Sequence, residues 1–289
     1  MAEIAGRPGV WFVNASYEWG CTARIDVEPL PVLRRTLDWP FPGLGRHVEV
    51  ALQDGGVGPY ANVTWPGAVG VLTALAPGRF AAAINQAPMY RRMRPMVFLP
   101  ADFILNGAAT WRLSGHWPVA HLLRHAFDTC RSFDDAVDLL TRAPVARPAL
   151  ISLVGPLAGQ GCLIERTETE ARIHRGTCTI ANDWHPGGPA RAGHWLCRGA
   201  LIHGPDDSER RRRSLETHAG ATPFGWLQSP VLNGLTRVAV EASLATGDLR
   251  VIGFEPTSRR MKAVAPATQQ LVTRVSDRGF GETARSAAA

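Results

Sequence analysis

Apolar residues gather in short runs that turn-forming residues separate, a pattern that is typical of β-strands. These runs predict strands at residues 21–27, 48–52, 68–75, 79–84, 149–154, 161–165, 171–175, 177–181, 235–244 and 249–254. Ala76-Pro77-Gly78 predicts a hairpin that joins 68–75 to 79–84, and Thr246-Gly247-Asp248 predicts another before residue 249. We expect the strands between residues 149 and 181 to share one sheet.

Helices are predicted at residues 118–128, 132–141 and 206–218. The first starts at a proline and has apolar residues at helical spacing, and the second opens with Ser132 as its cap and an acidic first turn. Residues 89–114 carry mixed helix and loop signals, and their methionines and phenylalanines would line an apolar pocket or fill the core. Blocks of strands that alternate with blocks of helices predict an α+β fold in one domain.

Composition and charge narrow the class of protein. The chain has 289 residues, 45% of them apolar, which suffices for a sizeable core. No apolar run approaches the roughly 18–20 residues of a membrane span, and we recognise no secretion signal. We therefore expect a cytoplasmic protein without stable membrane insertion.

The net charge is +6, and Arg210-Arg211-Arg212-Arg213 is the densest basic run. Because acidic residues flank this run, we interpret it as a solvated helix face with one arginine turned inward, and we expect no nucleic-acid partner. The cysteines lack metal-binding spacing, so we expect free thiols and neither a metal nor another cofactor. A metal at His116, His121 and His125 is disfavoured because a carboxylate partner at the expected spacing is missing.

A nucleophile, a cation and an anion lie within one short stretch. Cys21-Thr22 is followed by Arg35-Thr36-Leu37-Asp38-Trp39. Cysteine chemistry depends on the thiolate, which a charged environment promotes. If the chain is cut between Gly20 and Cys21, the new α-amine, with a pKa near 7.7–8.0, becomes a base for its own side chain.

Six segments in chain order resemble the cysteine N-terminal-nucleophile amide hydrolases. They are Cys21-Thr22, Arg35-Thr36-Leu37-Asp38-Trp39, the paired helices from Pro118 to Val137, Ala181-Asn182-Asp183-Trp184-His185, Asp206-Asp207 with the arginine run, and Pro230-Val231-Leu232-Asn233. The match is nearest to the acid ceramidase and N-acylethanolamine acid amidase branch, to which bile salt hydrolases and penicillin acyltransferases are related. The resemblance implies a four-layer αββα sandwich.

The resemblance also implies a role for each matched residue. Cys21 would attack the acyl carbon and form a thioester, while its freed α-amine accepts and returns the proton. Asp38 would hold that amine, Arg35 would favour thiolate, and Asn182 would donate to the oxyanion. Arg210 or Arg211 would brace the site, and the repeated arginines leave the choice between them open.

Other residues near these motifs are candidates for substrate contacts. They are Asn85, Trp39 and Trp184. A role in a turn is an equal alternative for Asn85, and capping a turn is an alternative for Asn182. His185 is disfavoured as a general base, because the resembled family takes its base from the chain terminus.

The chain divides into three expected parts. The resemblance implies that residues 1–20 are a leader removed by autocleavage and that 21–263 form the catalytic domain. Residues 264–289 are polar and lack a clear pattern, so they are predicted to be a C-terminal tail, open to disorder. The implied activity is hydrolysis of a small-molecule, linear N-acyl amide with a fatty or aryl acyl group. Acyl transfer to an amine and a silent binding protein that keeps its leader are the alternatives, and a homo-oligomer is compatible with each. Asn106 stands where the family carries a glutamate.

Overall fold

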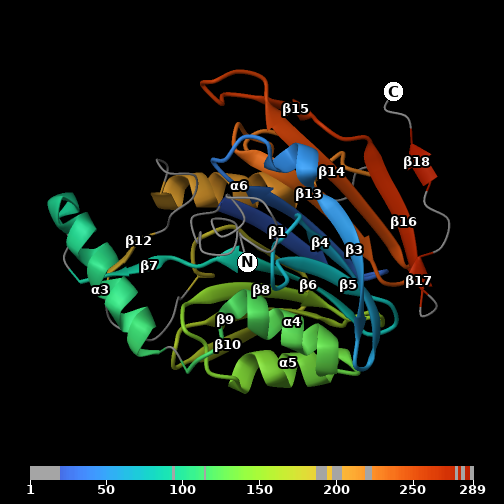
Figure 1. Cartoon of the computed structure of the whole chain (residues 1–289), viewed down its shortest axis with the longest axis horizontal. Helices are drawn as coiled ribbons and strands as arrows, with labels where there is room; N and C mark the ends of the chain where they lie inside the picture. Colours follow the sequence, from blue (N-terminus) through green and yellow to red (C-terminus); the bar gives the residue numbers. More distant parts are fainter. Residues whose placement is uncertain are drawn as a thin grey trace.

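The computed structural model describes residues 20–92, 95–113, 115–186, 194–196, 204–218, 223–276, 279–280 and 284–286. Two large antiparallel sheets pack face to face, and helices cover the outer face of each sheet (Figure 1). This arrangement confirms the α+β class and the four-layer αββα sandwich. The expected leader, apart from Gly20, lies outside the described residues.

The first sheet carries the candidate nucleophile. Its order is β11-β1-β2-β13-β14-β16-β17, with β15 paired to β14 and β18 paired to β16. The strands are β1 Gly20–Asp26, β2 Val32–Asp38, β11 Cys178–Ile180, β13 Thr236–Ser243, β14 Asp248–Pro256, β15 Val264–Pro266, β16 Gln270–Ser276, β17 Gly279–Phe280 and β18 Ala284–Ser286. The β1–β2 register aligns Gly20 with Asp38, so the predicted cleavage point lies beside the end of β2.

The second sheet lies beneath the first. Its order is β10-β9-β8-β6-β5-β4-β3. The strands are β3 Glu49–Gly55, β4 Gly58–Thr64, β5 Thr73–Ala76, β6 Phe80–Gln86, β8 Ala149–Val154, β9 Gly161–Arg166 and β10 Ala171–Arg175, with the short helix η1 Leu44–His47 before β3. Because successive side chains of a strand point to opposite faces, alternate residues of both sheets meet in one core, among them Leu33, Leu37, Val63 and Leu75.

Helices α4 Val119–Thr129 and α5 Phe133–Arg142 cover the second sheet. Phe127 of α4 packs on the rings of Phe80 and Tyr60, at centroid distances of 4.5 and 5.1 Å. Ser132 caps α5 by accepting a hydrogen bond from the Asp135 N–H, which confirms the predicted helix start. On the opposite side of the molecule, helix α6 Gly204–His218 lies over the first sheet (Figure 1).

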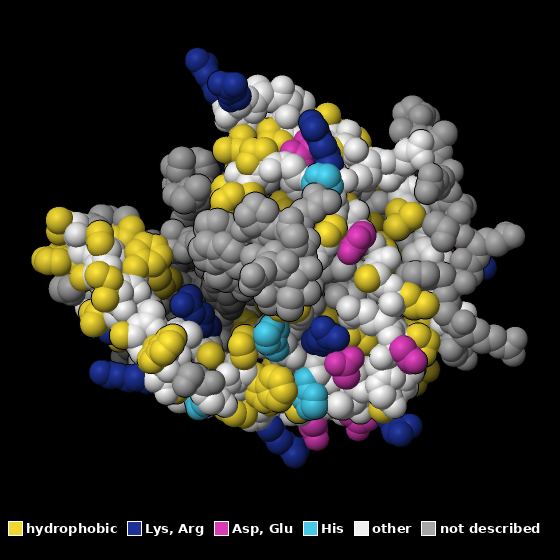
Figure 2. Space-filling view, viewed as in Figure 1, with side chains coloured by type: hydrophobic (Ala, Val, Ile, Leu, Met, Phe, Trp, Pro, Cys, Tyr) yellow, Lys and Arg dark blue, Asp and Glu magenta, His cyan; other side chains and the backbone are white. Residues whose placement is uncertain are grey.

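Residues 89–112, within the segment whose sequence carries mixed helix and loop signals, contribute to a small sheet and form a protruding helix. They form β7 Met89–Arg91, the short helix η2 Met96–Phe98 and helix α3 Leu99–Arg112, and β7 pairs with β12 His194–Leu196. Helix α3 extends away from the sandwich, and apolar side chains gather along it (Figures 1 and 2). Ile104 and Trp111 are 72% and 83% exposed, whereas Asp102 is buried. Because apolar residues occupy the outer face of α3, where a helix is usually polar, its sequence lacks the amphipathic pattern that predicts a helix.

Three predictions about strands were wrong. β11 pairs with β1 in the first sheet, because the chain leaves the second sheet at Gly176, whose φ of +97° turns it away from β10. The hairpin strand begins only at Thr73, because the Val71 N–H bonds to the Ala120 carbonyl of α4. Residues 264–276 form β15 and β16 instead of a tail, because alternate residues of β16, Thr273 and Val275, are buried.

Candidate active site

Cys21 lies fully buried near the start of β1, and its two reactive atoms have different partners. Its peptide N–H donates to Asn182 Oδ1 at 2.8 Å. Its Sγ lies 3.1 Å from Nη2 of Arg35. The Gly20–Cys21 peptide bond is intact in this structure, so the Cys21 nitrogen is an amide.

Burial raises the pKa of the Cys21 thiol to about 11. Arg35 and, to a lesser extent, Arg211 act in the opposite direction because a nearby cation favours the thiolate, whereas Asp38 adds to the rise. The thiol therefore stays protonated at neutral pH in the uncut chain. Its chemistry requires a base to take the proton.

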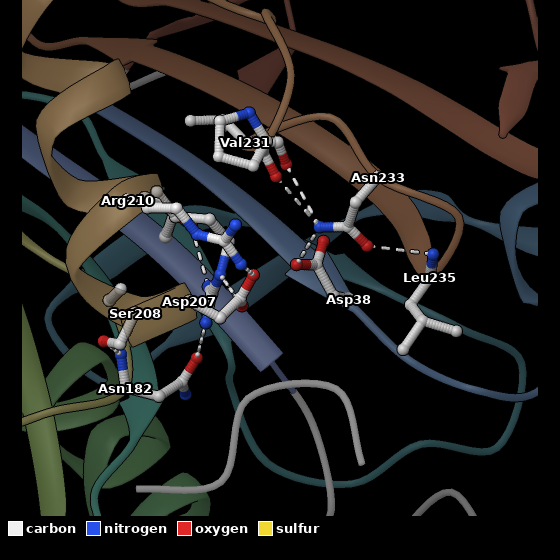
Figure 3. A network of polar contacts seen from close by, with 12 residues as sticks. Asp38, Asn182, Asp207, Ser208, Arg210, Val231, Asn233 and Leu235 are labelled. Carbon is white, nitrogen blue, oxygen red and sulfur yellow. Dashed lines mark hydrogen bonds and ion pairs between the residues drawn. The ribbon is translucent and has the colours of Figure 1, made fainter. Parts of the chain in front are cut away.

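Arg35 and Asp38, both from β2, flank the nucleophile. Arg35 Nη2 also donates to the Ile84 carbonyl of β6 at 2.9 Å, which ties the guanidinium across the two sheets. Asp38 accepts from Asn233 Nδ2 at 2.8 Å (Figure 3). It also accepts from Thr236 Oγ1 at 2.9 Å. Burial raises the pKa of the Asp38 carboxyl, and Arg211 opposes that rise.

Asn182 lies in the turn after β11 and joins three parts of the site. Its Oδ1 accepts from Cys21 N and from Arg211 Nη2, the latter at 3.0 Å. Its Nδ2 donates to the Gln86 carbonyl at 2.9 Å. In the uncut chain the amide nitrogen of Asn182 is thus engaged by Gln86, and the side chain presents its oxygen to Cys21.

The α6 helix holds this turn in place. Ser208 Oγ accepts from the backbone N–H groups of both Asn182 and Asp183, each at 3.0 Å. Figure 3 shows Ser208 beside Asn182. One turn further along, Arg211 is 1% exposed and donates to the Cys21 carbonyl and to Thr22 Oγ1. Its Nε bonds to Asp207 Oδ2 at 2.8 Å, at the i,i+4 spacing of a helical ion pair.

The structure separates the two arginine candidates. The Arg210 side chain is 64% exposed and, within the part of the chain that the structure describes, reaches only Asp207, at 3.6 Å (Figure 3). Arg211 is therefore the inward arginine of the run. Arg212 and Arg213 bond to Glu209 on the helix surface, as expected of a solvated face.

The predicted substrate contacts lie in three different environments. Asn85 is fully buried on β6 and donates to the Ala181 carbonyl at 2.9 Å, beside the Asn182 turn. Trp39 is fully buried in the core between the sheets, with its ring 6.0 Å from that of Trp65. Trp184 is half-buried and packs against the small apolar cluster that contains Ala87 and Leu150. Asn85 thus adjoins the site, whereas Trp39 occupies the core.

His185 does not face Cys21. Its backbone N–H donates to the buried carboxylate of Glu165 at 2.6 Å, and its ring lies 4.2 Å from that of His174. Glu165 also accepts from His174 Nε2 at 2.9 Å. Burial and the neighbouring His174 lower the pKa of His185. These contacts anchor the turn that carries Asn182.

A cavity of about 330 Å³ adjoins the site. Gln86 lines it and also gives the Cys21 sulfur a backbone hydrogen bond, so the cavity reaches the residue next to the nucleophile. Met89 and Phe103 line the cavity, as the sequence suggested for this segment. The volume falls within the usual range for small-molecule sites.

Sequence reasoning missed Gln86, Ser208 and Glu165. Ser208 carried a weak signal because it lies inside the Asp-Asp and arginine segment that the resemblance quoted. Gln86 and Glu165 act through backbone and carboxylate contacts that bridge distant elements, which spacing along the chain cannot reveal.

Over the described ranges, no cluster of three or more His, Cys, Asp or Glu side chains is placed to hold a metal ion. None of the helices in these ranges is long and apolar enough to span a bilayer.

The fold is that of the N-terminal-nucleophile amidases. The N-acylethanolamine-hydrolyzing acid amidase ortholog of Caenorhabditis elegans superposes with a TM-score of 0.58 at 18% identity, over 78% of this chain and 93% of that chain. A variant of conjugated bile acid hydrolase from Clostridium perfringens superposes with a TM-score of 0.54 at 9% identity, over 92% of this chain and 97% of that one.

Sequence similarity points to a particular branch. Acid ceramidase of Bos taurus is 26% identical over 115 residues, which are 39% of this chain and 26% of the relative. Acid ceramidase of Pan troglodytes is 28% identical over 115 residues, which are 37% of this chain and 25% of the relative. The match thus spans about a quarter of the curated relatives, and no family model matches the chain. Together, fold and sequence support a relationship to the cysteine N-terminal-nucleophile amidases.

Proposed function

We propose that this chain is a cysteine amidase that hydrolyses a linear N-acyl amide after cutting its own Gly20–Cys21 bond. The observation that carries the proposal is the convergence at Cys21 of Arg35, Asn182 and Arg211. These groups come from β2, a turn and α6, and they contact the sulfur, the nitrogen and the carbonyl of one residue. The names of its relatives, an acid ceramidase, an acid amidase and a bile acid hydrolase, all describe amide hydrolysis.

Self-cleavage uses the same nucleophile. Cys21 Sγ adds to the Gly20 carbonyl carbon, the bond from that carbon to the Cys21 nitrogen breaks, and the thiol proton passes to the leaving nitrogen. Water then adds to the thioester, which releases the Gly20 carboxyl group and restores the thiol. Asp38, whose carboxyl pKa burial raises, lies opposite this bond in the β1–β2 register and is suited to hold the amine as it forms.

Substrate hydrolysis repeats the chemistry on an external amide. The freed α-amine, now a base with a pKa near 8, takes the thiol proton as sulfur attacks the acyl carbon. It returns that proton to the leaving amine, and the acyl group stays on sulfur as a thioester. Arg35 stabilises negative charge at sulfur, and Asn182 donates to the oxyanion once its amide nitrogen leaves Gln86. Water then releases the acid and the free thiol.

Two other functions use the same fold. An acyltransferase would pass the thioester to an amine, and adding hydroxylamine distinguishes it because a hydroxamate then forms faster than the acid. A silent binding protein would retain residues 1–20, so the Cys21 nitrogen would remain part of a peptide bond. The contacts of Arg35 and Arg211 with Cys21 favour the amidase, because a binding role does not require cations at a buried thiol.

Intact mass spectrometry of the purified chain tests the proposal. We expect the wild-type protein to lose residues 1–20 and the Cys21→Ala variant to keep them, because alanine has no nucleophile. The Cys162→Ala variant is the matched control, since it removes a buried thiol outside the site and should still be cut.

Activity completes the test. The processed wild-type protein should release amine from N-acyl amides, and Cys21→Ala should release none above background. If Cys21→Ala were processed or active at the wild-type rate, the assignment of Cys21 would be wrong. If wild type and variant both kept the leader from acidic to neutral pH, the silent binding protein would be the better interpretation.

A further inference from the structure

The wall of the cavity beside Cys21 carries charged side chains. Its lining runs from Gln86, at the nucleophile, to helix α3 and to the turn between β9 and β10. Among the charged lining residues, Arg92 and Arg147 stand against the single carboxylate of Glu168. The described wall of the cavity is thus positive overall, although most of its lining is uncharged.

Two adjacent arginines differ in how their charge is balanced. Arg91 is buried and forms an ion pair with the buried carboxylate of Asp102, with Nε 2.5 Å from Oδ2. That carboxylate also accepts the Arg92 backbone N–H at 2.9 Å. Asp102 is therefore already neutralised by Arg91. The Arg92 guanidinium has no carboxylate within 4.0 Å among the described residues.

Neutral groups hold the Arg92 guanidinium in the cavity wall. Its Nη1 donates to Asn106 Oδ1 at 2.9 Å, and its central carbon lies 5.6 Å from the ring centroid of Tyr90. Asn106 is fixed in turn, because its Nδ2 donates to the Tyr90 carbonyl at 2.8 Å. Tyr90, Arg92 and Asn106 all line the cavity. The result is a solvent-exposed cation that neutral groups hold in place and that pairs with no carboxylate of the described residues.

We infer that the substrate of this site is an N-acyl amide that carries a carboxylate, which Arg92 binds in the wall of the cavity. This inference rests on the proposed amidase function and adds the charge of the substrate. Arginine suits this role because its guanidinium donates paired hydrogen bonds to a carboxylate. The carboxylate can lie on the amine side, as in an N-acyl amino acid, or at the far end of the acyl group.

Three substrates with matched acyl chains distinguish these cases. The ethanolamide of dodecanoic acid is the neutral reference. N-dodecanoylglycine carries a carboxylate on the amine side, and the mono-ethanolamide of dodecanedioic acid carries one at the acyl end. We expect kcat/KM for one of the two acids to exceed that of the reference by about tenfold or more, the usual effect of a hydrogen bond to a charged group.

Two variants identify Arg92 as the source of this preference. Arg92→Gln removes the cation, and Asn106→Asp keeps an acceptor for Nη1 but places a carboxylate beside it. Each should lower kcat/KM for the preferred acid by about tenfold and leave the neutral reference nearly unchanged. Arg92→Lys should retain part of the preference, because a lysine keeps the charge without the paired donors. Arg112→Gln is the control, because Arg112 is exposed on helix α3, which also carries Asn106. It should leave kcat/KM unchanged for both the acid and the neutral reference.

The outcomes separate this inference from the proposed function. If wild type hydrolyses the three amides equally, or if Arg92→Gln lowers all three alike, the inference is wrong and the amidase stands. If wild type hydrolyses none of them, the proposed function fails on these substrates. The same ligands are then compared by titration calorimetry, where equal affinity for acid and reference, or no binding, overturns the inference as well.

Discussion

The four consecutive arginines of α6 show how one position differs from the next. Arg211 is buried and bonds to Asp207, Cys21, Thr22 and Asn182, whereas the side chain of its neighbour Arg210 is 64% exposed. We expect Arg211→Met to cost about 3–5 kcal/mol in the free energy of unfolding, because it leaves the Asp207 carboxylate without its buried partner. The same variant should also lose self-cleavage.

Urea unfolding and intact mass measure both effects. Arg210→Met is the matched comparison, because an exposed ion pair contributes less than about 1 kcal/mol. It should unfold and process like the wild type. The reverse result, with Arg210→Met impaired and Arg211→Met normal, would contradict the inward placement of Arg211.

At the scale of elements, the hydroxyl of Ser208 on helix α6 binds the backbone of the Asn182 turn, while Arg211 of the same helix binds the Asn182 side chain. Ser208 is 2% exposed, and its Oγ accepts both the Asn182 and the Asp183 backbone N–H groups. Ser208→Ala leaves two buried donors without this acceptor, which costs about 1–3 kcal/mol for an unsatisfied buried group. We also expect slower self-cleavage, since Asn182 contacts the Cys21 nitrogen.

The appropriate readout is the rate of loss of residues 1–20 under conditions where the variant remains folded. Ser214→Ala, at a half-buried position of the same helix, serves as the reference, because among the described residues its hydroxyl makes only a 3.5 Å contact with the Ser229 carbonyl. A Ser208→Ala protein that is less stable but is cut at the wild-type rate would show that the hydroxyl supports the fold without positioning Asn182.

The sequence predicted those elements that depend on interactions between residues close together in the chain. Strand β1, helix α5 with its Ser132 cap and the β13–β14 hairpin were predictable because neighbouring residues determine them. The sheet that β11 joins was not, because a three-residue strand carries too little pattern to choose between two partners. Cys21, Arg35 and Asp38 were candidates from the motif, but the choice of Arg211 over Arg210 required the orientation of α6 on the first sheet.

At the scale of the whole molecule, the last strands complete the sheet that holds the nucleophile. β16 pairs with β14 from Asp248–Arg274 to Val251–Leu271, and Val275 joins the core between the two sheets. These strands were not predicted because residues 264–289 show no clear hydrophobic pattern, and β16 places only part of one face in the core. The lack of such a pattern therefore does not exclude a strand that lies near the edge of a sheet.

This placement predicts the effect of truncation. A chain that ends at Ala263 loses β15 and β16, which exposes the β14 edge and the apolar side chains that Val275 covers. Each buried aliphatic side chain contributes about 1.5–3 kcal/mol, so a loss of several kcal/mol and a fall in Tm of about 10 °C are expected. A chain that ends at Ser286 keeps both strands and should melt like the full protein. Differential scanning calorimetry of the three proteins measures this, and equal Tm values would mean that β15 and β16 add nothing to the stability of the sandwich.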